Sequence, residues 1–249
     1  MSISIGDLAA KGLTAFIADL DGVVTDTADV HARAWKRLFD AFLEGREGPG
    51  CRPFDAEGDY REYVDGKPRY DGVRAFLESR GITLPEGTPD DPPDAETVCG
   101  LGNRKNERFR ETVERDGVTV YDGAVALLEA LRARGFAVGL VSSSKNTQLV
   151  VEAAGLARLF DTVVDGVDRE RLGLPGKPAP DTFTLAAERL GVAPAAAVVA
   201  EDAVVGVEAG RAGGFGLVLG VDRGSGPDAL KAHGADVVVN DLGEVDRDG

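Results

Sequence analysis

The chain has 249 residues, of which 43% are hydrophobic and 29% charged, the balance of an ordinary globular protein. This length suits one large domain or two modest ones, each with its own core. Its 28 basic and 43 acidic residues give a net charge of -15, which argues against nucleic acid or an anionic membrane as the main partner. An anionic substrate would therefore need a local basic pocket.

The sequence carries no signal for export or membrane insertion. It has no run of about 18 apolar residues, and its first residues lack a basic segment followed by a long apolar one. Cys51 and Cys99 are too few for a disulfide framework in a chain of this size. We expect a cytoplasmic protein with both thiols reduced.

An apolar run followed by two acids forms the first predicted strand. Residues 13–18 are mostly apolar, and Asp19 and Asp21 follow before the chain breaks at Gly22. Because side chains alternate along a strand, both carboxylates would point to the same side, at the carboxyl end where open α/β sheets bind ligands. Two carboxylates this close need a cation or a proton between them, so the pattern predicts a divalent metal site.

Residues 27–44 are predicted to form a helix whose core-facing stripe includes Trp35. His31 lies one turn before Trp35, where a lone histidine is commonly a capping or surface residue. A polar loop rich in Gly and Pro follows over 45–55, and a short helical stripe lies within 60–80. The turn GKPR at 66–69 precedes that stripe and carries the positive charges of Lys67 and Arg69.

Residues 83–98 contain four prolines and five acidic residues, which predicts an exposed loop without a functional role. A helix resumes over 101–116 and carries Lys105 and Asn106. The chain should then return to its first domain, so that the two crossings of a hinge lie near 26–28 and 117–120. The crossings predict a core of residues 1–28 and 117–249 and an inserted domain of residues 29–116.

The rest of the chain alternates short apolar runs with helical patterns, which predicts a parallel sheet covered by helices on both faces. The predicted strands are 137–141, one near Val163, 197–200, 217–220 and 237–239. The predicted helices are 123–134, 145–157, 181–190, 203–212 and 227–233.

Further polar groups lie next to these elements. Strand 137–141 is followed by SSSKN at 142–146, where hydroxyls and helix N-terminal amides would suit a phosphate, although a serine cap gives the same pattern. Lys177 precedes a Pro-stiffened turn that begins a helix. Strand 197–200 ends in Glu201 and Asp202, and crowding these acids beside Asp19 requires a cation. Oxygen ligands alone suit Mg²⁺.

Four motifs in this order resemble those of the haloacid dehalogenase-like phosphotransferases: DLDGVVTD at 19–26, Ser142, KPAPD at 177–181 and ED at 201–202. The resemblance implies a Rossmann-like α/β core with an inserted α-helical cap domain. It also implies that Asp19 is the nucleophile and Asp21 the general acid and base. Ser142 would hold the transferring phosphoryl group, and Lys177 would neutralise its charge. Mg²⁺ would be bound by Asp19, the Asp21 backbone carbonyl, Asp202, and Glu201 directly or through water.

The residues after the first motif resemble, more narrowly, the β-phosphoglucomutases, in which this run reads TDTAxxHxxAWK. The resemblance implies that His31 helps to couple substrate entry and cap closure to Asp21. It implies that Arg69 binds the distal phosphate of the substrate, for which a planar guanidinium is suited. Five more residues would contact the substrate: Lys105, Asn106, Ser144, Lys145 and Asn146.

The resemblance implies phosphomonoester chemistry, and the acceptor of the phosphoryl group fixes the function. A sugar phosphate as acceptor would make the protein a β-phosphoglucomutase, which interconverts β-D-glucose 1-phosphate and glucose 6-phosphate through glucose 1,6-bisphosphate. Water as acceptor would make it a Mg²⁺-dependent sugar-phosphate phosphatase with the same residues. A non-catalytic binding protein would be expected to lose Asp19, Asp21 or Lys177, and all three are present. We favour the mutase, acting as a monomer on a small phosphorylated sugar.

Overall fold

The computed structural model describes residues 3–64, 67 and 69–247. They form two compact units, which we call the core unit (residues 1–27 and 118–249) and the insert unit (residues 28–117). Each unit has its own hydrophobic interior and is described separately below.

The core unit is built on a six-stranded parallel sheet with the strand order β5-β4-β1-β6-β7-β8. Its strands are β1 (Ala15–Asp19), β4 (Ala137–Val141), β5 (Thr162–Val164), β6 (Ala197–Glu201), β7 (Leu217–Val221) and β8 (Val237–Val239). Ala18 of β1 lies opposite both Leu140 of β4 and Ala200 of β6. This register brings the carboxyl ends of three strands to the same edge of the sheet.

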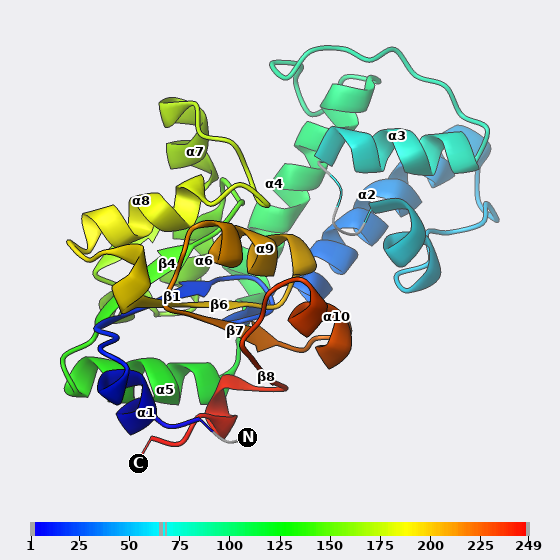
Figure 1. The fold of residues 1–249 in the computed structure, drawn as a ribbon. Helices are drawn as coiled ribbons and strands as arrows, with labels where there is room; N and C mark the ends of the chain where they lie inside the picture. The colour runs from blue at the N-terminus through cyan, green and yellow to red at the C-terminus, as the bar shows by residue number, and fades with distance from the viewer. Residues whose placement is uncertain (1–2, 65–66, 68, 248–249) are drawn as a thin grey trace. The chain divides into compact units, whose positions relative to one another are not determined.

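Helices cover both faces of this sheet, as predicted, with α5 on one face and α8 and α9 on the other (Figure 1). All residues of β1, β6 and β7 are buried, which explains their continuous apolar sequence. Ile17 of β1 packs in one cluster with Phe183 of α8. The helices of the core unit are α1 (Ile5–Ala10), α5 (Asp122–Ala133), α6 (Thr147–Ala153), α7 (Gly166–Leu172), α8 (Asp181–Arg189), α9 (Val204–Ala212) and α10 (Pro227–Ala232).

Two of these helices were missed by the sequence analysis, and one was predicted too long. Both α1 and α7 are short and are held by their caps: Ser4 and Asp7 form a capping box, and the Asp165 carboxylate accepts from the backbone N–H groups of residues 167 and 168. The helix predicted over 145–157 is only α6, because the chain turns at Gly155 in the left-handed region (φ 66°). A separate 3₁₀ turn then follows over Ala157–Leu159.

A short antiparallel ribbon marks the two places where the chain leaves the core unit and returns to it. It consists of β2 (Thr25–Asp26) and β3 (Thr119–Val120), with Thr25 opposite Val120. The sequence analysis placed the two hinge crossings at these positions. Further 3₁₀ turns of the core unit lie at Pro194–Ala196 and Leu242–Glu244.

The insert unit is helical, with α2 (Ala28–Glu47), a π-helical turn η1 (Tyr60–Val64), α3 (Arg69–Ser79) and α4 (Val98–Asp116). Its interior is aromatic: the ring of Phe39 lies between those of Trp35 and Phe76, with ring centroids 5.3 and 3.9 Å away. None of the helices in the described residues combines the length and the apolar composition that a membrane span requires. Cys51 and Cys99 are free thiols.

Candidate active site

The parallel register gathers the predicted catalytic residues of the core unit at one edge of the sheet. Asp19 ends β1, Ser142 follows β4, and Glu201 ends β6, the strand on the other side of β1. All three side chains are buried. Residues that are more than 100 positions apart in the sequence therefore meet because their strands are neighbours.

Lys177 links two of these acids. Its Nζ donates to Asp19 Oδ1 and, at 2.7 Å, to Glu201 Oε1. The Lys177 side chain is only 9% exposed. Burial opposes the ammonium charge, but Asp19 and Glu201 outweigh that effect and raise the pKa of Lys177. Burial also raises the pKa of the Asp19 carboxyl, and the ammonium of Lys177 works against that rise. Lys177 therefore stays charged beside the carboxylate that was predicted to be the nucleophile.

Asp21 is held by two hydroxyl groups. Thr27 Oγ1 donates to Asp21 Oδ1, and Ser142 Oγ lies 3.4 Å from Asp21 Oδ2. Burial raises the pKa of the Asp21 carboxyl, while the hydrogen bond from Thr27 acts in the opposite direction. A carboxyl whose pKa is raised is suited to proton transfer near neutral pH. The sequence analysis did not predict the contact with Thr27.

Both carboxylate oxygens of Glu201 accept hydrogen bonds. Its Oε2 accepts from the backbone N–H of Asp202 at 2.7 Å and from that of Ala203 at 3.3 Å, while its Oε1 accepts from Lys177 Nζ. A Cβ at Gly206 would come within 1.7 Å of Glu201 Oε1, so only glycine leaves room for this carboxylate. The structure thus shows why a glycine lies one turn after the acidic pair.

Asp202 packs against the turn that follows Asp21. Gly22 adopts a positive φ of 82°, and a Cβ there would come within 2.0 Å of Asp202 Oδ2. Burial and the neighbouring Glu201 raise the pKa of Asp202 to about 8. The same turn is held from outside by Arg223, whose Nε donates to the Gly22 carbonyl at 2.8 Å. Neither contact could be read from the sequence.

The carboxylates of Asp19, Glu201 and Asp202 form a group suited to a hard cation. Each offers an oxygen atom within 4.8 Å of the others. With Asp21 close by, these carboxylates outnumber the single positive charge of Lys177, and the Glu201 carboxylate adds to the effect of burial in raising the pKa of Asp202. An all-oxygen donor set with surplus negative charge fits Mg²⁺. The Asp21 side chain does not belong to this group.

The SSSKN segment forms a turn that supports Ser142. Ser142 Oγ accepts from the backbone N–H of Ser144, and Ser144 Oγ accepts from that of Asn146, both at 3.1 Å. Lys145 lies farther out, in an ion pair of 2.6 Å with Glu170 of α7. Of the three residues predicted here to contact the substrate, Lys145 therefore already has an acidic partner.

The insert unit brings two of its predicted residues together. Lys105 Nζ lies 2.6 Å from His31 Nδ1 and above the rings of Trp35 and Phe109. The His31 ring stacks on Phe109 with 4.4 Å between centroids. Burial, and then the charges of Lys105 and Arg69, lower the pKa of His31 well below its usual value. His31 is therefore neutral, and because Nδ1 accepts from Lys105, its proton lies on Nε2.

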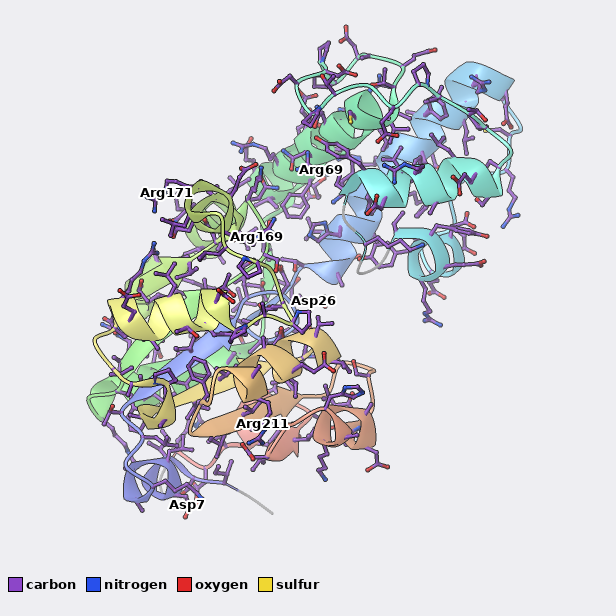
Figure 2. The ribbon with its side chains drawn as sticks, turned by 45° about the horizontal axis from the view of Figure 1, so that its top comes forward. Asp7, Asp26, Arg69, Arg169, Arg171 and Arg211 are labelled. Atoms are coloured by element: carbon purple, nitrogen blue, oxygen red, sulfur yellow. The ribbon has the colours of Figure 1, made fainter. Side chains whose placement is uncertain are left out.

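The remaining predicted residues of the insert unit are Arg69 and Asn106. Arg69 begins α3 (Figure 2), and its Nη1 donates to Asn103 Oδ1 of α4 at 3.2 Å. Asn106 follows Lys105 on α4 and is half-buried. Of the predicted turn before Arg69, Gly66 and Pro68 lie outside the described residues.

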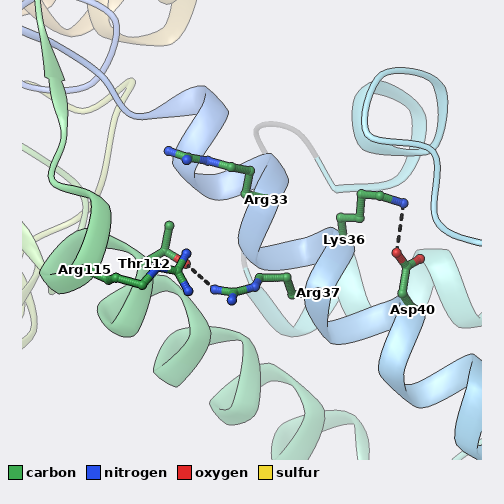
Figure 3. Close-up of a pocket in the computed structure, with 6 residues that line it drawn as sticks. All are labelled: Arg33, Lys36, Arg37, Asp40, Thr112 and Arg115. Carbon is green, nitrogen blue, oxygen red and sulfur yellow. Dashed lines mark hydrogen bonds and ion pairs between the residues drawn. The ribbon is translucent and has the colours of Figure 1, made fainter.

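An open pocket of about 280 Å³ lies between α2 and α4 of the insert unit and holds none of the predicted site residues (Figure 3). Two of its basic side chains have partners within the pocket: Lys36 pairs with Asp40 at 2.8 Å, and Arg37 donates to Thr112 at 3.3 Å. The pocket is lined by Arg33, Lys36, Arg37, Asp40, Thr112 and Arg115.

Comparison with known proteins agrees with this geometry. Residues 13–214 match the model of the haloacid dehalogenase-like hydrolases, and the chain belongs to this family. Within it, the chain is 53% identical over 237 residues to the β-phosphoglucomutase of Mycobacterium tuberculosis (strain CDC 1551 / Oshkosh), covering 93% of this chain and 90% of that protein. The resemblance to β-phosphoglucomutases drawn from the motifs is thereby confirmed.

Two further relatives show the range of the family. The crystal structure of a putative β-phosphoglucomutase from Thermotoga maritima superposes with a TM-score of 0.72 at 25% identity, covering 93% of this chain and 96% of that one. The fructose-1-phosphate phosphatase of Escherichia coli (strain K12) is 31% identical over 208 residues, covering 81% of this chain and 93% of that protein. Mutases and phosphatases therefore both occur among the relatives.

Proposed function

We propose that this protein is a β-phosphoglucomutase, which interconverts β-D-glucose 1-phosphate and glucose 6-phosphate. The observation that carries the proposal is the buried Asp19–Lys177–Glu201 arrangement, with Asp21 held two residues after Asp19. It supports transfer of a phosphoryl group through an aspartyl-phosphate. The 53% identity to a β-phosphoglucomutase supports a sugar phosphate, rather than water, as the acceptor.

Asp19 is the nucleophile of this mechanism. A carboxylate oxygen of Asp19 attacks phosphorus as the bond to the sugar oxygen breaks, which leaves an acyl phosphate on the enzyme. Lys177, which is hydrogen-bonded to Asp19, neutralises part of the negative charge on the phosphoryl oxygens. Ser142, whose Oγ lies near Asp21, donates to the transferring group.

Asp21 moves the proton. Its raised pKa lets it donate to the sugar oxygen that leaves phosphorus and then take the proton of the next acceptor hydroxyl. In the mutase cycle that acceptor is the 6-hydroxyl of β-glucose 1-phosphate, which receives the phosphoryl group from Asp19 and forms glucose 1,6-bisphosphate. The bisphosphate then presents its other phosphate to Asp19, and glucose 6-phosphate is released.

Asp19 and Asp202 are the residues that would bind Mg²⁺ directly, together with the backbone carbonyl of Asp21. Both oxygens of Glu201 already accept hydrogen bonds, so we assign Glu201 a contact through water. When bound, the ion supplies positive charge to the phosphoryl oxygens and the attacking carboxylate.

Residues 29–116 act as the cap of this enzyme and residues 1–28 and 117–249 as its catalytic core. A mutase must recognise a second phosphate and exclude water during transfer. We assign recognition of that phosphate to Arg69. The other substrate contacts are assigned to His31, Lys105, Asn106, Ser144, Lys145 and Asn146. The enzyme acts as a monomer on a small phosphorylated sugar, with glucose 1,6-bisphosphate as activator.

A sugar-phosphate phosphatase is the second candidate, favoured by the 31% identity to a fructose-1-phosphate phosphatase. One assay separates the two. The enzyme is given β-glucose 1-phosphate, Mg²⁺ and a trace of glucose 1,6-bisphosphate, and glucose 6-phosphate and free phosphate are followed together. Glucose 6-phosphate with little free phosphate supports the mutase, whereas free phosphate without glucose 6-phosphate contradicts it.

A further inference from the structure

Arg69 is held by a neutral partner. Its guanidinium donates to the side-chain oxygen of Asn103, and no carboxylate of the described residues forms an ion pair with it. The guanidinium therefore keeps its full charge and has further N–H groups to offer a ligand, since an arginine carries five. A carboxylate at position 103 would cancel that charge.

Asn103 uses every hydrogen-bonding position of its amide. Oδ1 accepts from Arg69 and, at 3.0 Å, from the hydroxyl of Tyr70. Nδ2 donates to the backbone carbonyls of Pro89 at 3.0 Å and Asp91 at 2.8 Å. Because both donors meet carbonyls and the acceptor meets two donors, only one orientation of this amide satisfies the network.

Pro89 and Asp91 belong to the acidic segment 83–98, which is ordered by bonds of its own. Asp91 accepts from Thr97 at 2.6 Å and from Thr88 at 3.0 Å. Arg104 of α4 donates to the Pro93 carbonyl at 2.6 Å. The segment is thus tied to α4 and is ordered by its own hydrogen bonds.

Two glycines make the arrangement possible. A Cβ at Gly102 would come within 2.6 Å of the Tyr70 ring and 3.3 Å of Arg69 Cδ, so α4 approaches the start of α3 closely. Gly87 adopts a φ of 73°, and a Cβ there would come within 2.0 Å of Asp91 Oδ2. Side chains at either position would displace the parts that meet at Asn103.

We propose that Asn103 and the acidic segment 83–98 form a brace that fixes the Arg69 guanidinium for the phosphate that is not being transferred. Asn103 is then a positioning residue, and the brace rests on the role that the proposed function gives to Arg69. The side-chain oxygen of Asn103 is a neutral acceptor that fixes the orientation of the guanidinium at one N–H group. The other N–H groups are left for phosphate oxygens. The acidic segment acts through its backbone carbonyls, whereas its carboxylates have other partners, such as Arg74 for Glu86.

Binding of glucose 1,6-bisphosphate tests the brace without turnover. The dissociation constant is measured by calorimetry in an Asp19→Asn background, with and without Asn103→Leu, which keeps the number and branching of the side-chain heavy atoms but removes the amide oxygen and nitrogen. We expect about tenfold weaker binding, the effect of losing one hydrogen bond to a charged group. In an Arg69→Ala background the same substitution should change nothing further. The brace would be overturned if Asn103→Leu weakened binding equally in the Arg69→Ala background, or if it did not weaken binding in the Asp19→Asn background.

Two variants keep the test informative if Asn103→Leu folds poorly. Asn103→Asp retains the shape but cancels the charge of Arg69, so it should weaken binding at least as much. Gly87→Ala disturbs the segment without touching Arg69, and its matched control is Gly81→Ala, where φ is 66° and nothing lies within 4 Å of the added Cβ. Only the substitution at Gly87 should weaken binding. Equal losses at both glycines would contradict a role for the segment.

The brace and the proposed function can fail separately. A wild-type enzyme that releases phosphate from β-glucose 1-phosphate without forming glucose 6-phosphate contradicts the mutase alone, because the binding experiment does not depend on the acceptor. If Arg69→Ala binds the bisphosphate as tightly as its parent, the role of Arg69 is wrong and the brace is overturned with it.

Discussion

The ammonium of Lys177 lies 2.7 Å from Glu201, an acid that is itself fixed by two backbone N–H groups. Glu201 thereby holds Lys177 against Asp19, the proposed nucleophile, at the end of the neighbouring strand. This fixed charge is in place before any substrate binds, which avoids reorganisation during the reaction.

Replacing Lys177 by Met should remove the positive charge and leave the buried carboxylates of Asp19 and Glu201 without a cationic partner. We expect kcat to fall about 100- to 1000-fold, the usual effect of losing one group that stabilises transition-state charge. Measuring turnover of both β-glucose 1-phosphate and a small aryl phosphate checks this, because the loss should be equal for the two. A variant that keeps a tenth of the wild-type kcat would contradict the assignment.

Asp19→Asn should abolish turnover while the fold persists, because the amide cannot form the acyl phosphate. Mass spectrometry of wild-type protein mixed with glucose 1,6-bisphosphate should detect one added phosphoryl group, and the variant should show none. Circular dichroism provides the control for folding. Turnover within tenfold of wild type would rule out Asp19 as the nucleophile.

Arg69→Ala should damage mutase turnover much more than hydrolysis of a small aryl phosphate, which has no second phosphate to recognise. We expect kcat/KM for β-glucose 1-phosphate to fall about 100-fold, as for the loss of a bidentate charged contact. The matched control is Arg37→Ala, an exposed arginine of the same unit that contacts Thr112. Equal losses on both substrates would count against the role of Arg69.

Removing Mg²⁺ should lower both activity and thermal stability, because a ligand that binds only the folded state stabilises it. Asp202→Asn should remove this dependence on Mg²⁺ and, in chelator, should melt at a higher temperature than wild type. The reason is that Asp202 is partly buried and lies beside Glu201, both of which disfavour its charge. Differential scanning with and without chelator measures both effects. A variant that is stabilised by Mg²⁺ as strongly as wild type would contradict direct binding by Asp202.

The neutral, half-buried His31 predicts a stability that falls in mild acid. An unfolded histidine has a pKa of about 6.5, whereas the pKa of folded His31 is well below that value. Above pH 6.5 both states are neutral, and below it the unfolded state alone takes up the proton. The difference in unfolding free energy between wild type and His31→Gln should therefore shrink by up to about 1.4 kcal/mol per pH unit below 6.5. Denaturant titrations at several pH values test this, and a difference that grows in acid would mean that folded His31 is charged.

The sequence by itself was sufficient for the sheet and for the residues at its edge. Strands 137–141 and 237–239 have the predicted bounds because a buried parallel strand is a short apolar run between polar ends. The acids and hydroxyls that follow those runs must then lie at the carboxyl edge. Helices α1 and α7 escaped prediction because a short helix held by its caps has no long apolar stripe.

Only the tertiary structure decided which distant groups touch. Three side chains make contacts that depend on packing: Thr27 donates to Asp21, Arg223 donates to the Gly22 backbone carbonyl, and Asn103 accepts from Arg69. Such contacts leave no periodic signal, because a hydrogen bond needs donor and acceptor within about 3 Å, and the sequence constrains that distance only through the fold. The acidic segment illustrates the point: its composition predicts exposure, but its backbone carbonyls also accept from the Asn103 amide, which in turn accepts from Arg69.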